Sequence, residues 1–135
     1  YNFVWIGDGE LNSLITAPNI EITGWMYNSE KVYQQLNKID VVLQTSLWEG
    51  LPIALLEALA LRKPIVATNV IGNKDIVIHG VNGFLFEKIE ELCTYFKNLE
   101  NETTRLKMGN NAFEICEKKF NNEINFKSLI EIYSS

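Results

Sequence analysis

Short apolar runs alternate with amphipathic stretches along most of this chain. Five runs rich in branched or aromatic residues predict strands at Phe3–Ile6, Ile20–Thr23, Val41–Gln44, Ile65–Thr68 and Phe84–Phe86. Helical periodicity lies between them, at Glu10–Ile15, Glu30–Ile39, Pro52–Leu61 and Asn73–Ile78. Strands that alternate with helices form a mostly parallel sheet with helices on both faces. The pattern therefore predicts a layered α/β fold.

The alternation stops after Phe86, and three helical stretches follow at Lys88–Leu99, Glu102–Lys119 and Asn122–Tyr133. In the second stretch, apolar or small residues recur at spacings of three and four, at Leu106, Gly109, Phe113 and Cys116. This spacing is typical of a helix face that packs on a sheet, so we expect these residues to belong to the core.

Composition and charge narrow the class of protein. With 135 residues, 47% apolar and 21% charged, the chain is typical of one soluble globular domain. The net charge of -5 argues against a nucleic-acid partner, which attracts a basic surface. Cys93 and Cys116 lie far apart without a CxxC motif, which favours reduced, buried thiols in a cytoplasmic protein. No apolar run approaches a membrane span of about 18 residues.

The segment from Glu49 to Glu57, EGLPIALLE, places two acids around a predicted helix start. Gly50 permits a close approach of the backbone, and Pro52 suits the first helical position. Because this segment follows a parallel strand, it should lie at the edge of the sheet where open α/β folds bind ligands. The unpaired amides of a helix start attract anions, so the pattern predicts a phosphate site.

The two acids bracket this predicted anion site. Glu57 lies roughly 7 to 8 Å along the helix axis beyond Pro52. A carboxylate accepts two hydrogen bonds side by side, which matches the vicinal hydroxyls of a ribose or a hexose. The alternatives are a solvated loop acid at Glu49 and an exposed helix edge at Glu57.

The same segment, with EALALRKPIVAT from Glu57 onward, resembles the E-x7-E motif of retaining glycosyltransferases of the GT-B fold, in particular the GT4 group. Four other segments resemble this family in collinear order: WIGDGE at 5–10, IEITGW at 20–25, IDVVLQTS at 39–46 and ATNVIGNKDIVIHGVNGFLF at 67–86. The resemblance extends over about residues 3 to 120. It implies a Rossmann-like three-layer α/β/α fold, as in the C-terminal, nucleotide-sugar-binding half of a GT-B glycosyltransferase.

The resemblance also implies roles for individual residues. Glu57 would hold the ribose hydroxyls of a nucleotide sugar, and Glu49, the residue assigned to catalysis, would hold hydroxyls of the transferred sugar. The donor site would further include Ser46 and the backbone amides of Gly50, Leu51 and Ile53. The turn of Trp25, Met26 and Tyr27 would lie beside the nucleobase, with Gly7 in a nearby loop of close approach. Stacking by Trp25 or Tyr27 competes with a place for these rings in the core.

The sequence departs from the family at two places. Many members carry Gly-Gly and Pro-Glu where this chain has Ile71 to Asp75, and a glycine where it has Arg62. The variant Gly-Asn-Lys/Arg-Asp is familiar in bacterial surface polysaccharide synthesis, so we expect transfer of a sugar to a glycan or lipid-linked acceptor. His79 falls in a turn of the family's pattern and is expected at the surface rather than as a catalytic base.

The family's donor domain opens with a strand, a Gly-Arg turn and a lysine. This sequence starts at Tyr1, without a methionine, and has no counterpart of these elements. We therefore expect residues 1–135 to be a single partial nucleotide-sugar-binding domain without its acceptor domain, inactive alone. In a sheet of order 3-2-1-4-5-6 the missing strand is central. A gap, a rearranged sheet or strand addition from another copy should result.

The resemblance implies an NDP-sugar substrate, UDP-sugar before GDP-sugar, and no cofactor. A helix start and the missing cations stabilise a diphosphate leaving group without a metal ion. The full-length enzyme would be cytoplasmic, which is compatible with peripheral association at the inner face of the membrane.

Three rival classes share the α/β pattern. A receiver domain needs acidic clusters at strand ends for Mg²⁺, but FVWIGDGE has one loop aspartate and VVLQTS has none. A nucleotide-sugar epimerase and a non-catalytic binding module remain as alternatives, which product analysis and nucleotide titration would separate.

Overall fold

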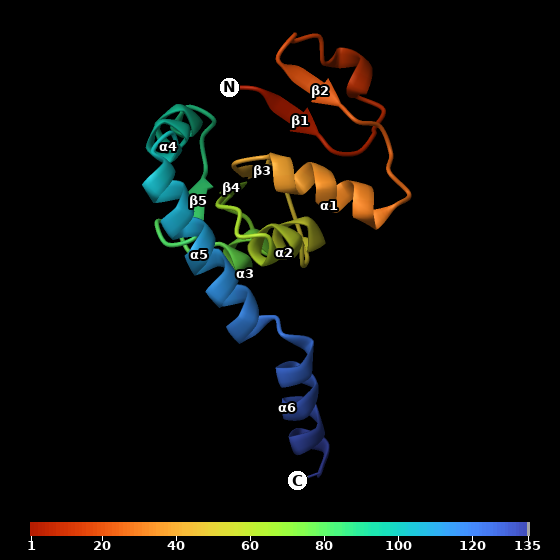
Figure 1. Ribbon diagram of the computed structural model, residues 1–135, viewed down its shortest axis with the longest axis vertical. Helices are drawn as coiled ribbons and strands as arrows, with labels where there is room; N and C mark the ends of the chain where they lie inside the picture. Colours follow the sequence, from red (N-terminus) through yellow and green to blue (C-terminus); the bar gives the residue numbers. More distant parts are fainter. Residues whose placement is uncertain (135) are drawn as a thin grey trace. The chain divides into compact units, whose positions relative to one another are not determined.

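The computed structural model describes residues 1–134 and confirms the alternation of strands and helices (Figure 1). The strands are β1 (Phe3–Trp5), β2 (Ile20–Ile22), β3 (Val42–Gln44), β4 (Ile65–Thr68) and β5 (Gly83–Phe86). The helices are α1 (Ser29–Lys38), α2 (Ile53–Ala60), α3 (Asn73–Ile76), α4 (Glu91–Leu99), α5 (Glu102–Lys119) and α6 (Asn122–Ser134). The helix predicted at Glu10–Ile15 is a short 3-10 helix, η1 (Asn12–Leu14).

The chain forms two compact units, Tyr1–Ile39 and Asp40–Ser135. In the first unit β1 and β2 pair in parallel, with Phe3 beside Ile20. In the second unit β3, β4 and β5 form a parallel sheet in that order. Within residues 1–134 the strands thus form a two-stranded and a three-stranded sheet rather than one regular sheet. What takes the place of the missing strand stays a prediction.

The second unit has a sheet that is buried on both faces. Ile65, Val66 and Ala67 are consecutive in β4 and all fully buried, although successive side chains of a strand point to opposite faces. Coverage of both faces is typical of parallel sheets in layered α/β folds. On one face the buried cluster consists of Val66, Phe84, Phe86, Leu99 and Met108. The predicted α/β fold with parallel strands is therefore confirmed.

Helix α5 packs against both α2 and α4, and it does so with a face that the sequence predicted only in part. Its buried residues are Met108, Gly109 and Ala112, whereas Leu106 is 61% exposed. The prediction of Leu106 as a core residue is therefore wrong. Gly109 fits because a side chain there would overlap the carbonyl oxygen of Arg62.

Arg62 follows α2 with φ +57°, in the left-handed region that favours glycine. This conformation explains why a glycine suits the position. The Arg62 guanidinium lies 3.8 Å from the centre of the Phe113 ring, and Nη1 donates to Asn110 Oδ1 at 3.1 Å. A cation–π contact and a hydrogen bond thus offset part of the backbone strain.

The two cysteines are both free, as predicted, but Cys93 is exposed and Cys116 is half-buried. The prediction of burial is therefore wrong for Cys93. Partial burial, with a smaller contribution from the negative charge of Glu117, raises the pKa of the Cys116 thiol. A raised pKa reduces the thiolate population and hence the reactivity of this group.

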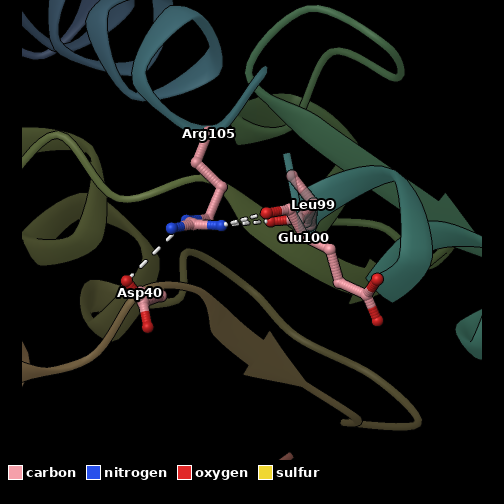
Figure 2. Close-up of polar contacts among 4 residues, drawn as sticks. All are labelled: Asp40, Leu99, Glu100 and Arg105. Atoms are coloured by element: carbon pink, nitrogen blue, oxygen red, sulfur yellow. Dashed lines mark hydrogen bonds and ion pairs between the residues drawn. The ribbon is translucent and has the colours of Figure 1, made fainter. Parts of the chain in front are cut away.

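Arg105 on α5 caps the carboxyl end of α4 with its side chain. Figure 2 shows its guanidinium between Asp40 and the main chain of Leu99 and Glu100. Nη1 donates to the carbonyl oxygens of Leu99 at 2.7 Å and Glu100 at 2.9 Å, whereas Nε lies 3.7 Å from Asp40 Oδ1. A cation at the carboxyl end of a helix satisfies carbonyls that have no partner within the helix.

We expect Arg105→Met to reduce the free energy of unfolding by about 1.5 to 3 kcal/mol, the range for hydrogen bonds to charged groups. Asp40→Asn should cost less than about 0.5 kcal/mol, because the Asp40 side chain is 79% exposed and exposed ion pairs contribute little. Urea denaturation of both variants measures the two effects. Equal losses would show that the ion pair, and not the cap of α4, is the stabilising contact.

Candidate functional site

The predicted anion site lies where the loop after β3 enters α2. Because β3 and β4 are parallel, with Gln44 beside Ala67, this loop leaves the carboxyl end of its strand as predicted. Pro52 is the N-cap of α2, and its carbonyl oxygen accepts from the Leu55 amide at 3.0 Å. No side chain of the described residues caps this helix start. The first amides of α2 are thus arranged as in anion-binding helix termini.

Glu49 is half-buried in this loop and has a specific partner. Its Oε1 accepts a hydrogen bond from Gln44 Nε2 at 2.7 Å. The same nitrogen donates to Ser46 Oγ at 2.8 Å. Glu49 is therefore not the freely solvated loop acid that was the alternative from the sequence. Sequence reasoning missed Gln44, although a polar residue that ends the apolar run VVLQ was a signal.

A second set of hydrogen bonds ties the loop after β3 to the loop after β4. Thr68 Oγ1 donates to the Ser46 carbonyl oxygen at 2.5 Å. Asn73 Nδ2 donates to the carbonyl oxygen and to Oγ1 of Thr68, both at 3.0 Å. Asn73 is fully buried at the start of α3. These bonds fix the backbone at Ser46, and sequence reasoning missed both Thr68 and Asn73.

Gly72 lies directly against the loop that carries Glu49. It has φ +86°, and a Cβ atom there would be 2.5 Å from the Gly50 carbonyl oxygen and 2.9 Å from Glu49 Cβ. Real side chains do not reach such distances without a shift of their neighbours, and the nearest atom here is backbone. A glycine at this position is therefore required twice, for its φ and for its contact with the loop.

The remaining predicted residues of the second unit follow along the loop and α2. Gly50, Leu51 and Ile53 are exposed, and Glu57 is half-buried beside the fully buried Ala58. Ile53 and Glu57 are four residues apart on α2, so they lie on one helix face with Cβ atoms about 5 to 6 Å apart. The exposed start of α2 and the Glu57 side chain thus share one side of the helix.

The predicted nucleobase turn lies in the first unit. Gly7 has φ +133°, forms an isolated bridge with Gly24, and donates its amide to Thr23 Oγ1 at 3.1 Å. Trp25 is 66% exposed and Tyr27 94% exposed, with ring centres 6.4 Å apart in an edge-to-face contact. Met26 between them is half-buried. Neither ring belongs to a core, so the core alternative is wrong for both.

His79 is exposed, as predicted, and its contacts are structural. Its Nδ1 accepts from the Leu85 amide at 3.1 Å, and its ring packs edge-on against Phe84 and Tyr95. Among residues 1–134, no group of three or more His, Cys, Asp or Glu side chains could hold a metal ion. In the same part of the chain, every helix is too short or too polar to span a membrane.

A parallel α/β fold with a ligand-type loop at the start of α2 is typical of nucleotide-binding proteins. Comparison with known sequences identifies the family. A profile of the family described as "Glycosyl transferases group 1" matches residues 1–101. The chain belongs to this family of glycosyltransferases.

Two curated relatives are similar to this chain over most of its length. It is 30% identical to UDP-Gal:alpha-D-GlcNAc-diphosphoundecaprenol alpha-1,3-galactosyltransferase of Escherichia coli, over 96% of this chain and 34% of that protein. It is 28% identical to the capsular polysaccharide biosynthesis glycosyltransferase CapM of Staphylococcus aureus, over 96% of this chain and 34% of that protein. The chain thus spans about a third of the length of these curated relatives.

Solved structures give the same fold. The crystal structure of Anabaena Alr3699/HepE in complex with UDP matches with a TM-score of 0.85 and 25% identity, over 98% of this chain and 40% of HepE. HepE in complex with UDP-glucose matches with a TM-score of 0.81 and 24% identity, over the same shares of the two chains. These likenesses confirm the predicted fold class.

Proposed function

We propose that this chain is the nucleotide-sugar-binding part of a longer glycosyltransferase that acts in bacterial surface polysaccharide synthesis. The single observation that carries the proposal is the uncapped start of α2, preceded by the half-buried and hydrogen-bonded Glu49. Membership of the family and the two polysaccharide-related relatives support it. Neither the epimerase nor a non-catalytic module is favoured by these relatives.

In this proposal the donor diphosphate lies at the start of α2. The amides of Gly50, Leu51 and Ile53 donate to diphosphate and sugar oxygens, whereas Pro52 has no amide hydrogen to donate. Glu57 holds the ribose hydroxyls, and Glu49 holds hydroxyls of the transferred sugar. Trp25, Met26 and Tyr27 lie beside the nucleobase, and the exposure of Trp25 and Tyr27 leaves their rings accessible to it. Ser46 in the second unit and Gly7 in the first are further residues that we assign to donor binding.

The proposed chemistry is governed by the charge of the leaving group. Cleavage of the bond between the anomeric carbon and the phosphate oxygen leaves that electron pair on the diphosphate. Amides and a helix dipole that are already oriented stabilise this charge in the transition state without a metal ion. Glu49 binds the sugar and is not the nucleophile. The transferred sugar keeps its anomeric configuration.

UDP-sugar is the favoured donor, with GDP-sugar second, because the Anabaena HepE structures hold UDP and UDP-glucose. The acceptor is a glycan or a lipid-linked sugar and is bound by a part of the enzyme outside this chain. The galactosyltransferase relative is named for a diphosphoundecaprenol acceptor, which supports this class. The proposal includes a cytoplasmic full-length enzyme in peripheral contact with the inner face of the membrane, and an acceptor of this class supports it.

We expect the full-length enzyme to bind UDP more tightly than GDP and with equal affinity in Mg²⁺ and in EDTA. Isothermal titration calorimetry with both nucleotides measures this directly. Proton NMR of the glycoside formed from an α-linked UDP-sugar should show an α anomer. Absence of binding to either nucleotide would exclude the donor site, and a β anomer would exclude a retaining enzyme.

A further inference from the structure

We propose that Gln44 is a positioning residue of the donor site and that it orients the carboxylate of Glu49. The inference rests on the proposed role of Glu49 at the transferred sugar. It starts from a polar side chain where the chain otherwise places apolar ones: Gln44 ends β3 after the buried Val42 and the core-packed Leu43. The Gln44 side chain is itself half-buried.

The chemistry of the amide group fixes its direction. Burial of an amide is unfavourable unless its polar atoms are hydrogen-bonded, and Nε2 carries two hydrogens. The structure gives this nitrogen two acceptors, Glu49 Oε1 at 2.7 Å and Ser46 Oγ at 2.8 Å. An ionised carboxylate only accepts, so the nitrogen and not the oxygen of the amide must face Glu49.

Gln44, the donor of this bond, is held by its strand pairing and by its second hydrogen bond to Ser46. Gln44 is paired with Ala67 in the last pair of the β3–β4 ladder. Ser46, its second acceptor, has a backbone fixed by Thr68, which Asn73 holds in turn. Glu49 instead lies in the loop after β3, where the adjacent residue Trp48 is 84% exposed. The hydrogen bond from Gln44 therefore links the Glu49 carboxylate to the end of a sheet strand and restricts its orientation.

The bond also decides which lone pairs of Glu49 face a ligand. Oε1 accepts from Gln44, which leaves Oε2 and a second lone pair of Oε1 for sugar hydroxyls. A hydrogen bond to an ionised group is shorter and stronger than one between neutral groups, so it holds the carboxylate in a defined direction. Positioning of this kind acts on turnover more than on nucleotide binding, because Gln44 itself does not reach the ligand in this proposal.

The test is a double-mutant cycle in the full-length enzyme. We expect Gln44→Leu to reduce kcat for release of UDP from a UDP-sugar by about 10-fold, while UDP affinity changes by less than about 2-fold. In the Glu49→Ala background, Gln44→Leu should have no further effect, because the group through which it acts is gone. Gln44→Glu keeps the size of the side chain but places a like charge beside Glu49, so it should reduce kcat more than Gln44→Leu.

Gln34→Leu, on the exposed face of α1, is the matched control and should leave kcat and UDP affinity unchanged. Equal loss from Gln44→Leu with and without Glu49, or a parallel loss of UDP affinity, would show a general structural role and overturn the proposal. Full activity of Gln44→Leu beside an impaired Glu49→Ala would overturn the role of Gln44 alone. A fully active Glu49→Ala would instead remove the proposed role of Glu49, and that of Gln44 with it.

Discussion

Glu57→Ala in the full-length enzyme is expected to weaken the binding of UDP and of a UDP-sugar alike. The loss should be about 10- to 100-fold, which corresponds to about 1.5 to 3 kcal/mol for hydrogen bonds to a charged group. In the proposed site the Glu57 carboxylate holds the ribose hydroxyls, which are a part that both ligands share. Calorimetric titration with the two ligands measures both affinities.

Glu49→Ala should separate the two ligands instead. If its carboxylate contacts only the transferred sugar, UDP affinity stays nearly unchanged, whereas affinity for the UDP-sugar or its turnover falls. The loss should lie mainly in kcat when the contact tightens in the transition state. Steady-state rates of UDP release supply this second measurement. Small and equal effects of both variants on both ligands would mean that neither carboxylate lines the donor site.

The elements of this fold could be predicted because their patterns are local. Each strand and helix has an apolar run or a helical period within its own residues, and the structure places every one of them close to its predicted bounds. The sequence predicts the period of a helix more reliably than which of its faces is buried. On α5 the buried residues are Met108, Gly109 and Ala112, so the predicted stripe that included Leu106 had the correct spacing but a rotated face. Only contact with α2 and α4 fixes that rotation.

The candidate site was predictable only where it follows one continuous segment. Gly50 to Glu57 can be interpreted as a loop and a helix start from the sequence itself. The partners that hold this segment come from other segments: Thr68 lies 22 residues from Ser46, and Gly72 contacts the backbone of Glu49 and Gly50. Such contacts depend on how parallel strands are aligned in space, and neighbouring residues carry no pattern that reveals them.

Gly72→Ala is expected to be the most damaging single change at this site. Alanine would have to adopt φ +86°, which is unfavourable for any side chain, and its Cβ would press on Gly50 and Glu49. Strain and overpacking together should reduce the free energy of unfolding by about 2 to 5 kcal/mol. Because the neighbours that must shift belong to the proposed donor loop, UDP-sugar turnover should fall as well.

Gly80→Ala is the matched control for this prediction. Gly80 has a similar φ of +78°, but nothing lies within 4 Å of an added Cβ. Its variant therefore carries the backbone strain without the contact, at a cost of about 1 to 2 kcal/mol, and should retain full turnover. Urea denaturation and UDP release, measured on both variants, give the difference that belongs to the contact with the Glu49 loop. Equal destabilisation with turnover intact in both would show that Gly72 is required only for its backbone conformation, and that its approach to Gly50 has no bearing on the donor site.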